Sequence, residues 1–179
     1  FDNSNIQGTN PVSACVVFKD GKPSKADYRI FHPKTVEGPD DFATMREAVY
    51  RRYRRLLEED QPLPQLIIID GGKGQLGAAL EAIEEIGLQK ELKLVGLAKR
   101  LEELYKPGFS KSLILSRRSL ALKLVQQLRD EAHRFGLSHH RNRRSKNAIA
   151  SELDEVKGLG PKTIELLYHE FKTLSKMKV

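Results

Sequence analysis

Residues 66–75 read LIIIDGGKGQ, an apolar run that ends at a carboxylate and two glycines. Such an uninterrupted apolar run is typical of a strand that is covered on both faces of a sheet. Ligand sites of α/β proteins tend to lie at the carboxyl ends of these strands, which is where Asp70 falls. The glycines leave room for a substrate backbone beside that carboxylate. The stretch therefore predicts a buried central strand with Asp70 at a functional edge, the alternative being an acidic turn residue at a strand end.

The segments on either side of this strand alternate between strand and helix patterns. Before it, the sequence predicts two strands joined across an Asp20-Gly21 turn and one long amphipathic helix, at residues 12–18, 26–31 and 42–57. After it come a helix, a buried strand, a small hairpin and a third helix, at residues 75–86, 92–97, 101–115 and 122–135. Meander strands followed by helix–strand units imply an α/β fold, a mixed sheet with helices on its faces. The ribonuclease H-like fold has this order of elements, and several other α/β folds come close to it.

The character of the sequence changes near residue 148. Apolar positions at residues 153–159 and a helical pattern at residues 164–171 flank the sequence Gly158-Leu159-Gly160-Pro161-Lys162. A short helix, a Gly-x-Gly turn and a second helix form a helix-hairpin-helix unit, in which backbone N–H groups approach a DNA phosphate. An ordinary αα-turn with a glycine cap is the alternative. We predict a ribonuclease H-like domain at residues 1–148 and a small all-α DNA-binding unit at residues 149–179.

The charge of the chain favours a polyanionic partner. The formal net charge is +7 and the isoelectric point is about 9.5. Between Arg134 and Ala148 the chain has no acidic residue and the basic residues Arg134, Arg141, Arg143, Arg144 and Lys146. This basic run is suited to hold a phosphate backbone. The basic cluster at residues 51–55 is partly offset by acids and is typical of a solvated helix face.

Composition disfavours several other classes of protein. No apolar run is long enough to cross a membrane, and no basic-then-apolar leader opens the chain. The single cysteine, Cys15, lies in an apolar run and rules out a disulfide framework. We therefore expect a buried thiol in a reducing, cytoplasmic compartment. The chain opens on Phe1 rather than methionine, and we expect it to be a piece of a longer protein.

The glycine-rich segment after Asp70 fits neither of the common nucleotide-binding motifs. Residues 71–75 lack the spacing and the Ser or Thr of a P-loop, and they lack the dinucleotide fingerprint. A structural zinc site is also disfavoured, because the chain has one cysteine and no suitable Cys/His spacing.

Four residues on separate elements carry groups suited to metal-assisted phosphodiester hydrolysis: Asp2, Asp41, Asp70 and His133. Carboxylates from several elements suit hard cations such as Mg²⁺ or Mn²⁺. Such ions activate water and stabilise the charged transition state, and a nearby histidine would move a proton. Taken singly, the aspartates are also explained as helix caps or turn residues, and His133, on the polar flank of its helix, as a solvated side chain.

Five stretches, in order, resemble motifs of the C-terminal half of the UvrC family, the incising component of the UvrABC excision nuclease. They are Phe1-Asp2-x-Ser4, Gly38-Pro39-Asp40-Asp41-Phe42-Ala43-x-Met45, Ile69-Asp70-Gly71-Gly72-Lys73-Gly74-Gln75, Arg129-Asp130-Glu131-Ala132-His133-Arg134-Phe135 and Gly158-Leu159-Gly160-Pro161-Lys162. The third and fourth are highly specific, and together the stretches span nearly the whole chain. One motif departs from the family pattern, because many relatives read Phe-Asp-Ile-Ser-His where this chain has Asn3 and Asn5.

The resemblance implies a ribonuclease H-like nuclease that cuts damaged double-stranded DNA on the 5′ side of a lesion in nucleotide excision repair. The implied catalytic residues are Asp2, Asp41, Asp70 and His133, with Mg²⁺ or Mn²⁺ held by the aspartates. Asp41 is preferred to Asp40 because it directly precedes the Phe-Ala-x-Met stretch. The expected DNA contacts are Lys73, Arg134, Arg141, Arg143, Arg144, Gly158, Gly160 and Lys162. UvrB is the implied protein partner, through a segment upstream of this chain.

Two rival functions remain open from the sequence. A DNA-binding module that kept the fold and lost turnover would need no metal ion. The other rival is a structure-specific nuclease that acts outside excision repair, for example on RNA–DNA hybrids. The hairpin unit favours DNA over such hybrids.

Overall fold

The computed structural model describes residues 1–6, 9–36, 38–98, 103–154, 156 and 158–171. Its contacts divide the chain into two compact units, Phe1–Gly136 and Leu137–Val179. The division falls inside helix α3 (Leu120–Asp154). The domain boundary that the sequence suggests, between residues 148 and 149, stays a prediction.

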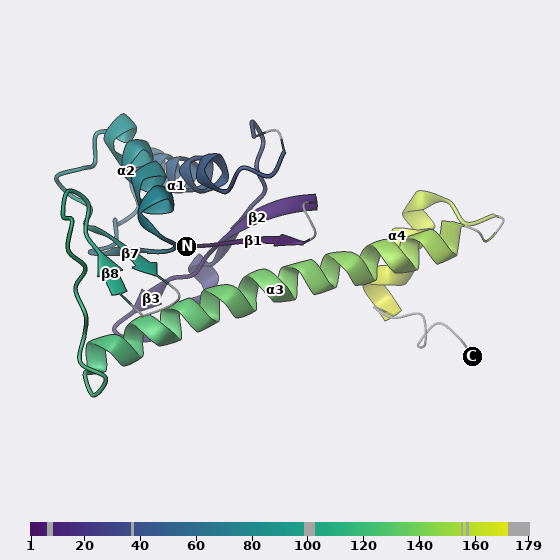
Figure 1. Ribbon diagram of the computed structural model, residues 1–179. Coiled ribbons are helices and arrows are strands. Elements are labelled where there is room, and N and C mark those ends of the chain that lie inside the picture. The colour runs from purple at the N-terminus through teal and green to yellow at the C-terminus, as the bar shows by residue number, and fades with distance from the viewer. Residues whose placement is uncertain (7–8, 37, 99–102, 155, 157, 172–179) are drawn as a thin grey trace. The chain divides into compact units, whose positions relative to one another are not determined.

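A six-stranded mixed sheet forms the centre of the first unit (Figure 1). Its order is β5-β2-β1-β6-β7-β8, with bounds β1 Asp2–Ile6, β2 Thr9–Cys15, β5 Arg29–Phe31, β6 Ile67–Asp70, β7 Leu94–Ala98 and β8 Glu103–Tyr105. β1, β6 and β7 are parallel, whereas β2, β5 and β8 run antiparallel to the strands beside them. Antiparallel strands therefore flank a parallel centre, which confirms the predicted mixed sheet.

Helices cover both faces of this sheet (Figure 1). α1 (Asp41–Glu58) and α2 (Lys73–Ile86) pack together on one face, over a core that includes Met45 and Ile83. The first part of α3 covers the other face, where Val125 packs with Leu97 and Leu104. Two apolar layers thus enclose the parallel strands, as the continuous apolar run of β6 predicts.

The alternation of side chains along the strands sends both central carboxylates to the α3 face. Ile69 is buried in the core beneath α1 and α2, whereas Ile68 packs in the core beneath α3. Successive strand side chains point to opposite faces, so Asp70 lies on the same face as Ile68. Phe1 belongs to the α1–α2 core, and its neighbour Asp2 therefore also faces α3.

α1 confirms the predicted amphipathic helix and its acidic cap. Asp40 is the N-cap, and its Oδ1 accepts the backbone N–H groups of Phe42 and Ala43, each at 2.9 Å. A carboxylate in this position satisfies donors that the first turn leaves unpaired, and it interacts favourably with the helix dipole. The cap fixes where the helix begins, and therefore where its first residue, Asp41, stands.

The Asp20-Gly21 turn is present, but it joins different strands from those predicted. It closes a separate ribbon of β3 (Phe18–Lys19) and β4 (Lys22–Pro23). Asp20 and Gly21 have positive φ angles of 52° and 72°, as a two-residue hairpin turn requires. Pro23 has no N–H to continue the ladder. A 3-10 turn, Lys25–Asp27, then leads into β5, which pairs with β2.

α3 is longer than the sequence predicts. The predicted helix at residues 122–135 and the short helix near residue 153 are parts of one helix. The segment contains no proline and a single glycine, so no strong stop signal interrupts it. α4 (Pro161–Phe171) follows, with proline at the first helical position, where a missing N–H costs no hydrogen bond. DNA binding by the intervening turn stays a prediction.

Two expectations from composition can be compared with the fold. Cys15 is buried, and this burial raises the pKa of its thiol, which leaves little reactive thiolate at neutral pH. Among the described residues, no helix combines the length and apolar character needed to span a bilayer.

Candidate active site

Asp2 and Asp70 lie side by side at the centre of the sheet. β1 and β6 are parallel neighbours, and Asp2 is the register partner of Asp70. The two residues are 1% and 6% exposed. Because neighbouring strands are about 4.8 Å apart, the two carboxylates share one site on the α3 face. The sheet thereby joins two motifs that are far apart in the sequence.

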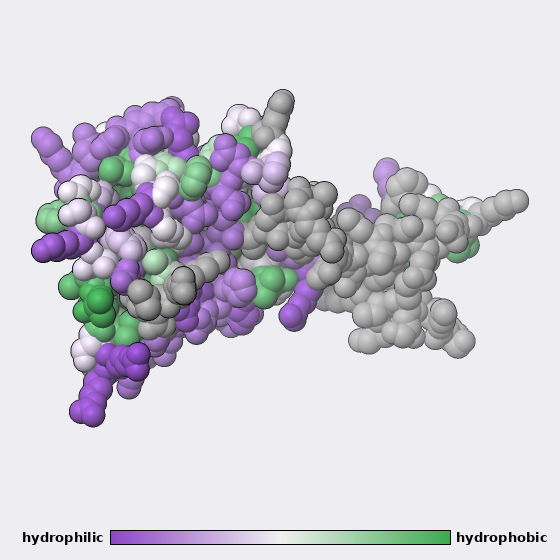
Figure 2. All heavy atoms as spheres, viewed as in Figure 1, coloured by the Kyte–Doolittle hydropathy of each residue, from purple (hydrophilic) through white to green (hydrophobic). Residues whose placement is uncertain are grey.

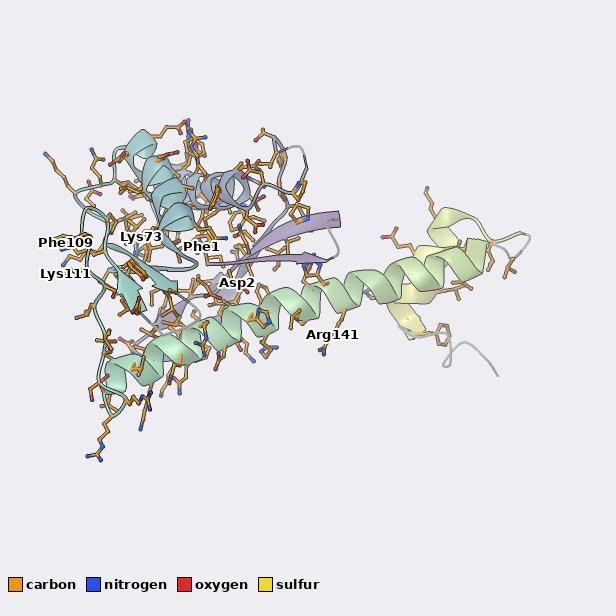
Figure 3. The ribbon with its side chains drawn as sticks, viewed as in Figure 1. Phe1, Asp2, Lys73, Phe109, Lys111 and Arg141 are labelled. Atoms are coloured by element: carbon orange, nitrogen blue, oxygen red, sulfur yellow. The ribbon has the colours of Figure 1, made fainter. Side chains whose placement is uncertain are left out.

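Phe1 anchors the strand that carries Asp2 (Figure 3). Its backbone nitrogen donates to the Ile68 carbonyl at 2.7 Å, and its carbonyl accepts from the Asp70 N–H at 2.8 Å. Its ring is buried, with its centroid 6.1 Å from that of Tyr53 on α1. Hydrogen bonds on one side and aromatic packing on the other therefore fix the backbone from which Asp2 projects.

His133 reaches Asp2 from α3. Its Nδ1 lies 3.2 Å from the Oδ2 of Asp2, and its side chain is 54% exposed. The other oxygen of Asp2, Oδ1, is buried and has no hydrogen-bond donor among the described residues. The imidazole is therefore oriented by a buried carboxylate and remains accessible to water and substrate, as a group that moves protons must be.

Asp41, in the first turn of α1, is linked to the strand of Asp2 through Asn3, and among the described residues its carboxylate is not grouped with the other candidate residues. Its side chain is exposed, and its backbone carbonyl accepts a 2.7 Å hydrogen bond from the Nδ2 of Asn3, the residue after Asp2. The carboxylate of Asp40 is engaged in capping the helix. This engagement supports Asp41 as the member of the pair that acts on a substrate or metal. The sequence singled out Asn3 only as a departure from the family pattern.

Glycines allow the turn after Asp70 to pack closely against its neighbours. A Cβ added at Gly96 of β7 would lie 3.1 Å from the backbone oxygen of Gly71. A Cβ added at Gly74 would lie 2.7 Å from the ring of Phe42, which belongs to the first turn of α1. The contact at Gly96 seats the turn after Asp70 against β7, and the contact at Gly74 brings the start of α2 against the start of α1.

A hydrogen-bonded group fixes α3 near His133. The Tyr28 hydroxyl donates to the Oε1 of Glu131 at 3.1 Å, and Arg134 donates to both oxygens of the same carboxylate at 2.7 Å. The rings of Tyr28 and Phe135 meet edge to face, with centroids 5.2 Å apart. Burial and the adjacent Glu131 raise the pKa of Tyr28 to about 12, and the hydrogen bond from Arg134 lowers the pKa of Glu131. No sequence motif pointed to Tyr28, because the contact joins segments that are distant in the chain.

Residues 1–137 match the family model of the UvrC RNase H endonuclease domain. The chain belongs to this family. The match confirms the ribonuclease H-like fold that the order of elements and the motifs predicted. It spans all four candidate catalytic residues of the UvrC resemblance.

Curated proteins named UvrABC system protein C are similar to the whole chain. The protein from Flavobacterium johnsoniae is 63% identical over 179 residues, and that from Flavobacterium psychrophilum is 61% identical over 179 residues. A protein from Porphyromonas gingivalis is 59% identical over 178 residues. These alignments cover 99% to 100% of this chain and 30% of each relative. The chain therefore spans about 30% of the length of the UvrC relatives that it matches.

The UvrC-family site offers carboxylates without forming a closed cage for a metal. Across the described residues, no three His, Cys, Asp or Glu side chains are grouped closely enough to hold one ion. Mg²⁺, however, is usually bound by one or two protein carboxylates, with waters and substrate phosphates completing its shell. Asp2 and Asp70 supply such a pair, and the Oδ1 of Asp2 is a buried acceptor without a donor in the described part of the chain. The residues present fit an ion of this kind.

The residues of the UvrC motifs and the basic run that we predict to contact DNA differ in the exposure and existing partners of their side chains. Lys73 is exposed in the first turn of α2, and Arg141 is exposed on α3 (Figure 3). Arg134 is exposed but engaged with Glu131. The side chains of Arg143 and Arg144 lie outside the described residues. The contact of each with DNA stays a prediction.

The second unit contains the predicted hairpin residues of the UvrC resemblance. Gly158 and Gly160 are exposed in the turn before α4, and Gly158 has a φ of 94°. The Gly160 carbonyl accepts the N–H groups of Thr163 and Ile164 as α4 begins. Lys162 is exposed in the first turn of this helix. These residues are placed where the sequence predicts them, and their role in binding DNA stays a prediction.

Proposed function

We propose that this chain is a metal-dependent DNA endonuclease that cuts damaged double-stranded DNA on the 5′ side of a lesion in nucleotide excision repair. The observation that carries the proposal is the pairing of Asp2 with Asp70, both buried, with His133 beside the first of them. The Asp2 carboxylate is almost fully buried and its Oδ1 has no donor among the described residues, which is costly unless a cation or a proton neutralises it. Membership of a family named for an endonuclease domain supports the same conclusion.

The aspartates would hold Mg²⁺ or Mn²⁺, because hard cations prefer oxygen ligands. Asp2 and Asp70 would be the principal protein ligands. Asp41 would complete the site, either as a third ligand or as the group that orients the attacking water. When bound, the ion supplies positive charge for the transition state and a nucleophilic water at neutral pH.

His133 would move the proton. Its Nδ1 lies beside Asp2 at 3.2 Å, which leaves Nε2 as the ring nitrogen available to water or substrate. Imidazole is suited to accept and donate protons near neutral pH, so this nitrogen would take a proton from the attacking water or deliver one to the leaving oxygen.

Positive charge would position the DNA. Lys73, the basic run with Arg141, Arg143 and Arg144, and the turn with Gly158, Gly160 and Lys162 would contact phosphates. Arg134 would join them if DNA displaced it from Glu131. The relatives are named for the UvrABC system and extend beyond the aligned region, and we infer that UvrB binds through such a region. An excision-repair role would place the protein in the bacterial cytoplasm.

Locating Mn²⁺ tests the metal site directly. Crystals of the chain would be soaked in Mn²⁺, and the ion would be located from its anomalous signal. We expect a peak between Asp2 and Asp70 that Asp2→Asn and Asp70→Asn each remove. Asp60→Asn is the matched control, because Asp60 is exposed and its φ of 50° is one that asparagine tolerates. Mn²⁺ bound elsewhere, or absent from the pair even with DNA present, would contradict the proposal.

An incision assay separates a nuclease from a pure DNA binder. The aligned region of the Flavobacterium johnsoniae relative would be replaced by this chain, and the hybrid protein would be incubated with UvrA, UvrB, Mg²⁺ and a duplex carrying one lesion. We expect a cut on the 5′ side that Asp2→Asn and Asp70→Asn abolish and Asp60→Asn retains. DNA binding without cutting would identify the non-catalytic module instead. Preferred cutting of RNA–DNA hybrids would favour a nuclease outside excision repair.

A further inference from the structure

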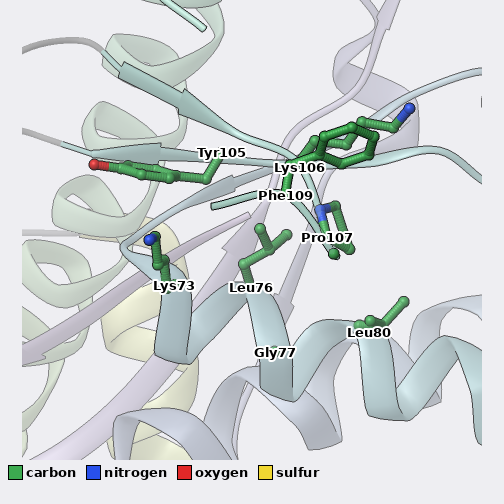
Figure 4. A pocket seen from close by; sticks show the side chains of 9 residues that line it. Lys73, Leu76, Gly77, Leu80, Tyr105, Lys106, Pro107 and Phe109 are labelled. Carbon is green, nitrogen blue, oxygen red and sulfur yellow. The ribbon is translucent and has the colours of Figure 1, made fainter. Parts of the chain in front are cut away.

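A pocket lies beside Lys73, at the β8 edge of the sheet (Figure 4). The first turns of α2 and the loop that follows β8 form its walls, and its volume is about 180 Å³. Leu76, Leu80 and Pro107 line it, and Lys73 extends toward the Tyr105 ring. The pocket is therefore apolar inside and carries positive charge at its rim.

A tight turn presents an aromatic ring to solvent at this pocket. Lys106-Pro107-Gly108-Phe109 is closed by a hydrogen bond from the Phe109 N–H to the Lys106 carbonyl at 3.1 Å. Gly108 follows a proline and has a φ of 77°, as in a type II turn. Phe109 is 60% exposed, and the Nζ of Lys106 lies 4.8 Å from its ring centroid. A ring this exposed contributes little to the core, so most of its surface is open to a partner.

Lysines lie at both aromatic rings of this pocket, without carboxylate partners among the described residues. The Nζ of Lys73 lies 5.2 Å from the Tyr105 ring centroid and donates to the Ser110 carbonyl at 3.3 Å. Neither Lys73 nor Lys106 nor the exposed Lys111 forms an ion pair with a carboxylate within the described residues. An ammonium has three N–H donors, so Lys73 retains donors for a phosphate. These cations complement a polyanion rather than an acidic patch of their own fold.

Exposed apolar side chains and lysines also lie together on the molecular surface in the figures. Lys73, Phe109 and Lys111 lie on one side of the first unit (Figure 3). Figure 2 shows hydrophobic side chains gathered among hydrophilic ones on the side where β8 and the loop after it lie. Leu113 and Ile114, in the same loop, are 59% and 70% exposed. The surface is therefore mixed, with apolar area bordered by lysines.

The pocket lies a short distance along the sheet from the carboxylates. Asp70 is the register partner of Leu97, and Leu97 is the partner of Leu104, the residue before Tyr105. With strands about 4.8 Å apart, Leu104 lies roughly 10 Å from Asp70. Along the axis of a duplex, that distance corresponds to about three nucleotides of one strand, at a rise of roughly 3.4 Å each. Asp70 faces α3, whereas Tyr105 packs against the core beneath α1 and α2, so a strand held at the carboxylates would pass around the carboxyl end of β6 to reach the pocket.

We infer that this pocket binds an unpaired base of a DNA strand, stacked on Phe109, with the neighbouring phosphates on Lys73, Lys106 and Lys111. Aromatic rings among cations bind single-stranded nucleic acid because every base has a π face and every nucleotide carries a phosphate. A paired base keeps its faces within the duplex stack, so the pocket favours an opened strand. The inference rests on the proposed function for its substrate, DNA, and adds to it a site that recognises strand opening.

Binding of a fluorescent oligothymidine in EDTA tests the pocket apart from the metal site. We expect Phe109→Ala to weaken binding by roughly 5- to 150-fold, the usual loss for one stacked base, and to leave duplex binding unchanged. Phe109→Trp keeps a stacking ring and should bind like the unmodified chain. Lys106→Ala should weaken binding and reduce the salt slope by about 1. Lys90→Ala, which removes an exposed lysine after the far end of α2, is the matched control. It should neither weaken binding nor reduce the salt slope.

Photocrosslinking locates the bound base. Oligonucleotides with 5-iododeoxyuridine should crosslink to Phe109 or Tyr105, as identified by mass spectrometry, and the melting temperature of each variant verifies its fold. Unchanged single-strand binding in well-folded Phe109→Ala and Lys106→Ala variants would overturn the inference. In the hybrid with the Flavobacterium johnsoniae relative, loss of UvrB binding with DNA binding intact would overturn it too, by assigning the surface to a protein. Failure of the hybrid protein to cut would contradict the proposed function alone, because base binding is measured without metal.

Discussion

The Nδ2 of Asn3 donates a 2.7 Å hydrogen bond to the backbone carbonyl of Asp41. Asn3 follows Asp2 on β1, and Asp41 is the first residue of α1. The bond therefore ties the helix that carries one candidate carboxylate to the strand that carries another. The Oδ1 of Asn3 is buried with no donor among the described residues, so the tie has a cost in stability that an apolar residue would avoid.

Asn3→Leu should lower cutting while leaving stability almost unchanged. Leucine is similar in size, removes the unsatisfied oxygen and loses the donor, so the effects on the free energy of unfolding should offset to within about 1 kcal/mol. Without the tie, the start of α1 can move away from β1. We expect Mn²⁺ affinity or cutting to fall roughly 10- to 100-fold, as for other residues that orient metal ligands. Urea unfolding and Mn²⁺ titration measure the two effects, and full activity in the folded variant would show that the bond is only structural.

Asp40→Ala and Asp41→Asn should separate a cap from a catalytic group. The Asp40 carboxylate caps α1, so alanine there should cost about 1 kcal/mol of stability with most cutting retained. Asp41→Asn leaves the cap in place and should reduce cutting by at least about 100-fold with little change in stability. Thermal unfolding and incision rates of both variants give the comparison. Loss of cutting in Asp40→Ala, with cutting retained in Asp41→Asn, would assign the catalytic role to Asp40.

Local patterns predicted the parts of the site that depend on neighbours in the sequence. The apolar run ending at Asp70 is β6, and the amphipathic pattern preceded by an acidic cap is α1. Periodicity and capping chemistry are determined within a single strand or turn, which is why the sequence alone was sufficient.

Contacts between distant segments could not be predicted in this way. A slip of one residue in the register of β1 would turn Asp2 to the opposite face, away from Asp70, and no local pattern fixes that register. Helical periodicity placed His133 on a polar flank, in agreement with its 54% exposure, but did not reveal that this flank meets Asp2. Arg134, predicted to contact phosphate, is engaged with Glu131. That pair is local, three residues apart on one helix, so helical spacing could have predicted it; the contact of Glu131 with Tyr28 could not be predicted in this way.

The pocket beside Lys73 also has no signature in the sequence. Pro107-Gly108 was recognised as the turn of a predicted hairpin at residues 101–115, and the structure retains a bridge between Leu104 and Leu113 there. The exposure of Phe109 is a property of the folded surface. It follows from the turn geometry and from the absence of covering segments among the described residues, neither of which a periodicity reveals.

Tyr28→Phe should change how stability responds to alkaline pH. Burial and the adjacent Glu131 raise the pKa of Tyr28 from 10.0 to about 12 in the folded chain. Between these values the unfolded chain loses the proton first, so the free energy of unfolding falls as pH rises through this window and is unaffected by this group below it. From about pH 9 to about pH 11, the stability advantage over Tyr28→Phe should shrink by roughly 1 kcal/mol. Urea unfolding at the two pH values measures the change, and an advantage that stays constant would contradict the prediction.

Gly74→Ala and Gly77→Ala form a matched pair on α2. A Cβ added at Gly77 would meet nothing within 4 Å, so alanine there should stabilise the helix by up to about 1 kcal/mol. A Cβ added at Gly74 would lie 2.7 Å from the Phe42 ring, which is 57% exposed and can swing aside. We therefore expect Gly74→Ala to fold but to move Phe42, and with it the turn that carries Asp41, so that cutting falls.

A double-mutant cycle isolates the contact between Gly74 and Phe42. If the ring transmits the effect, Gly74→Ala should lower cutting in the unmodified chain and have no further effect in the Phe42→Ala background. The coupling between the two changes should then be at least about 0.5 kcal/mol in transition-state free energy, as for residues in direct contact. Additive effects would show that Gly74 acts through the backbone of α2 instead. In that case the close approach of the two helix starts would not be what positions Asp41.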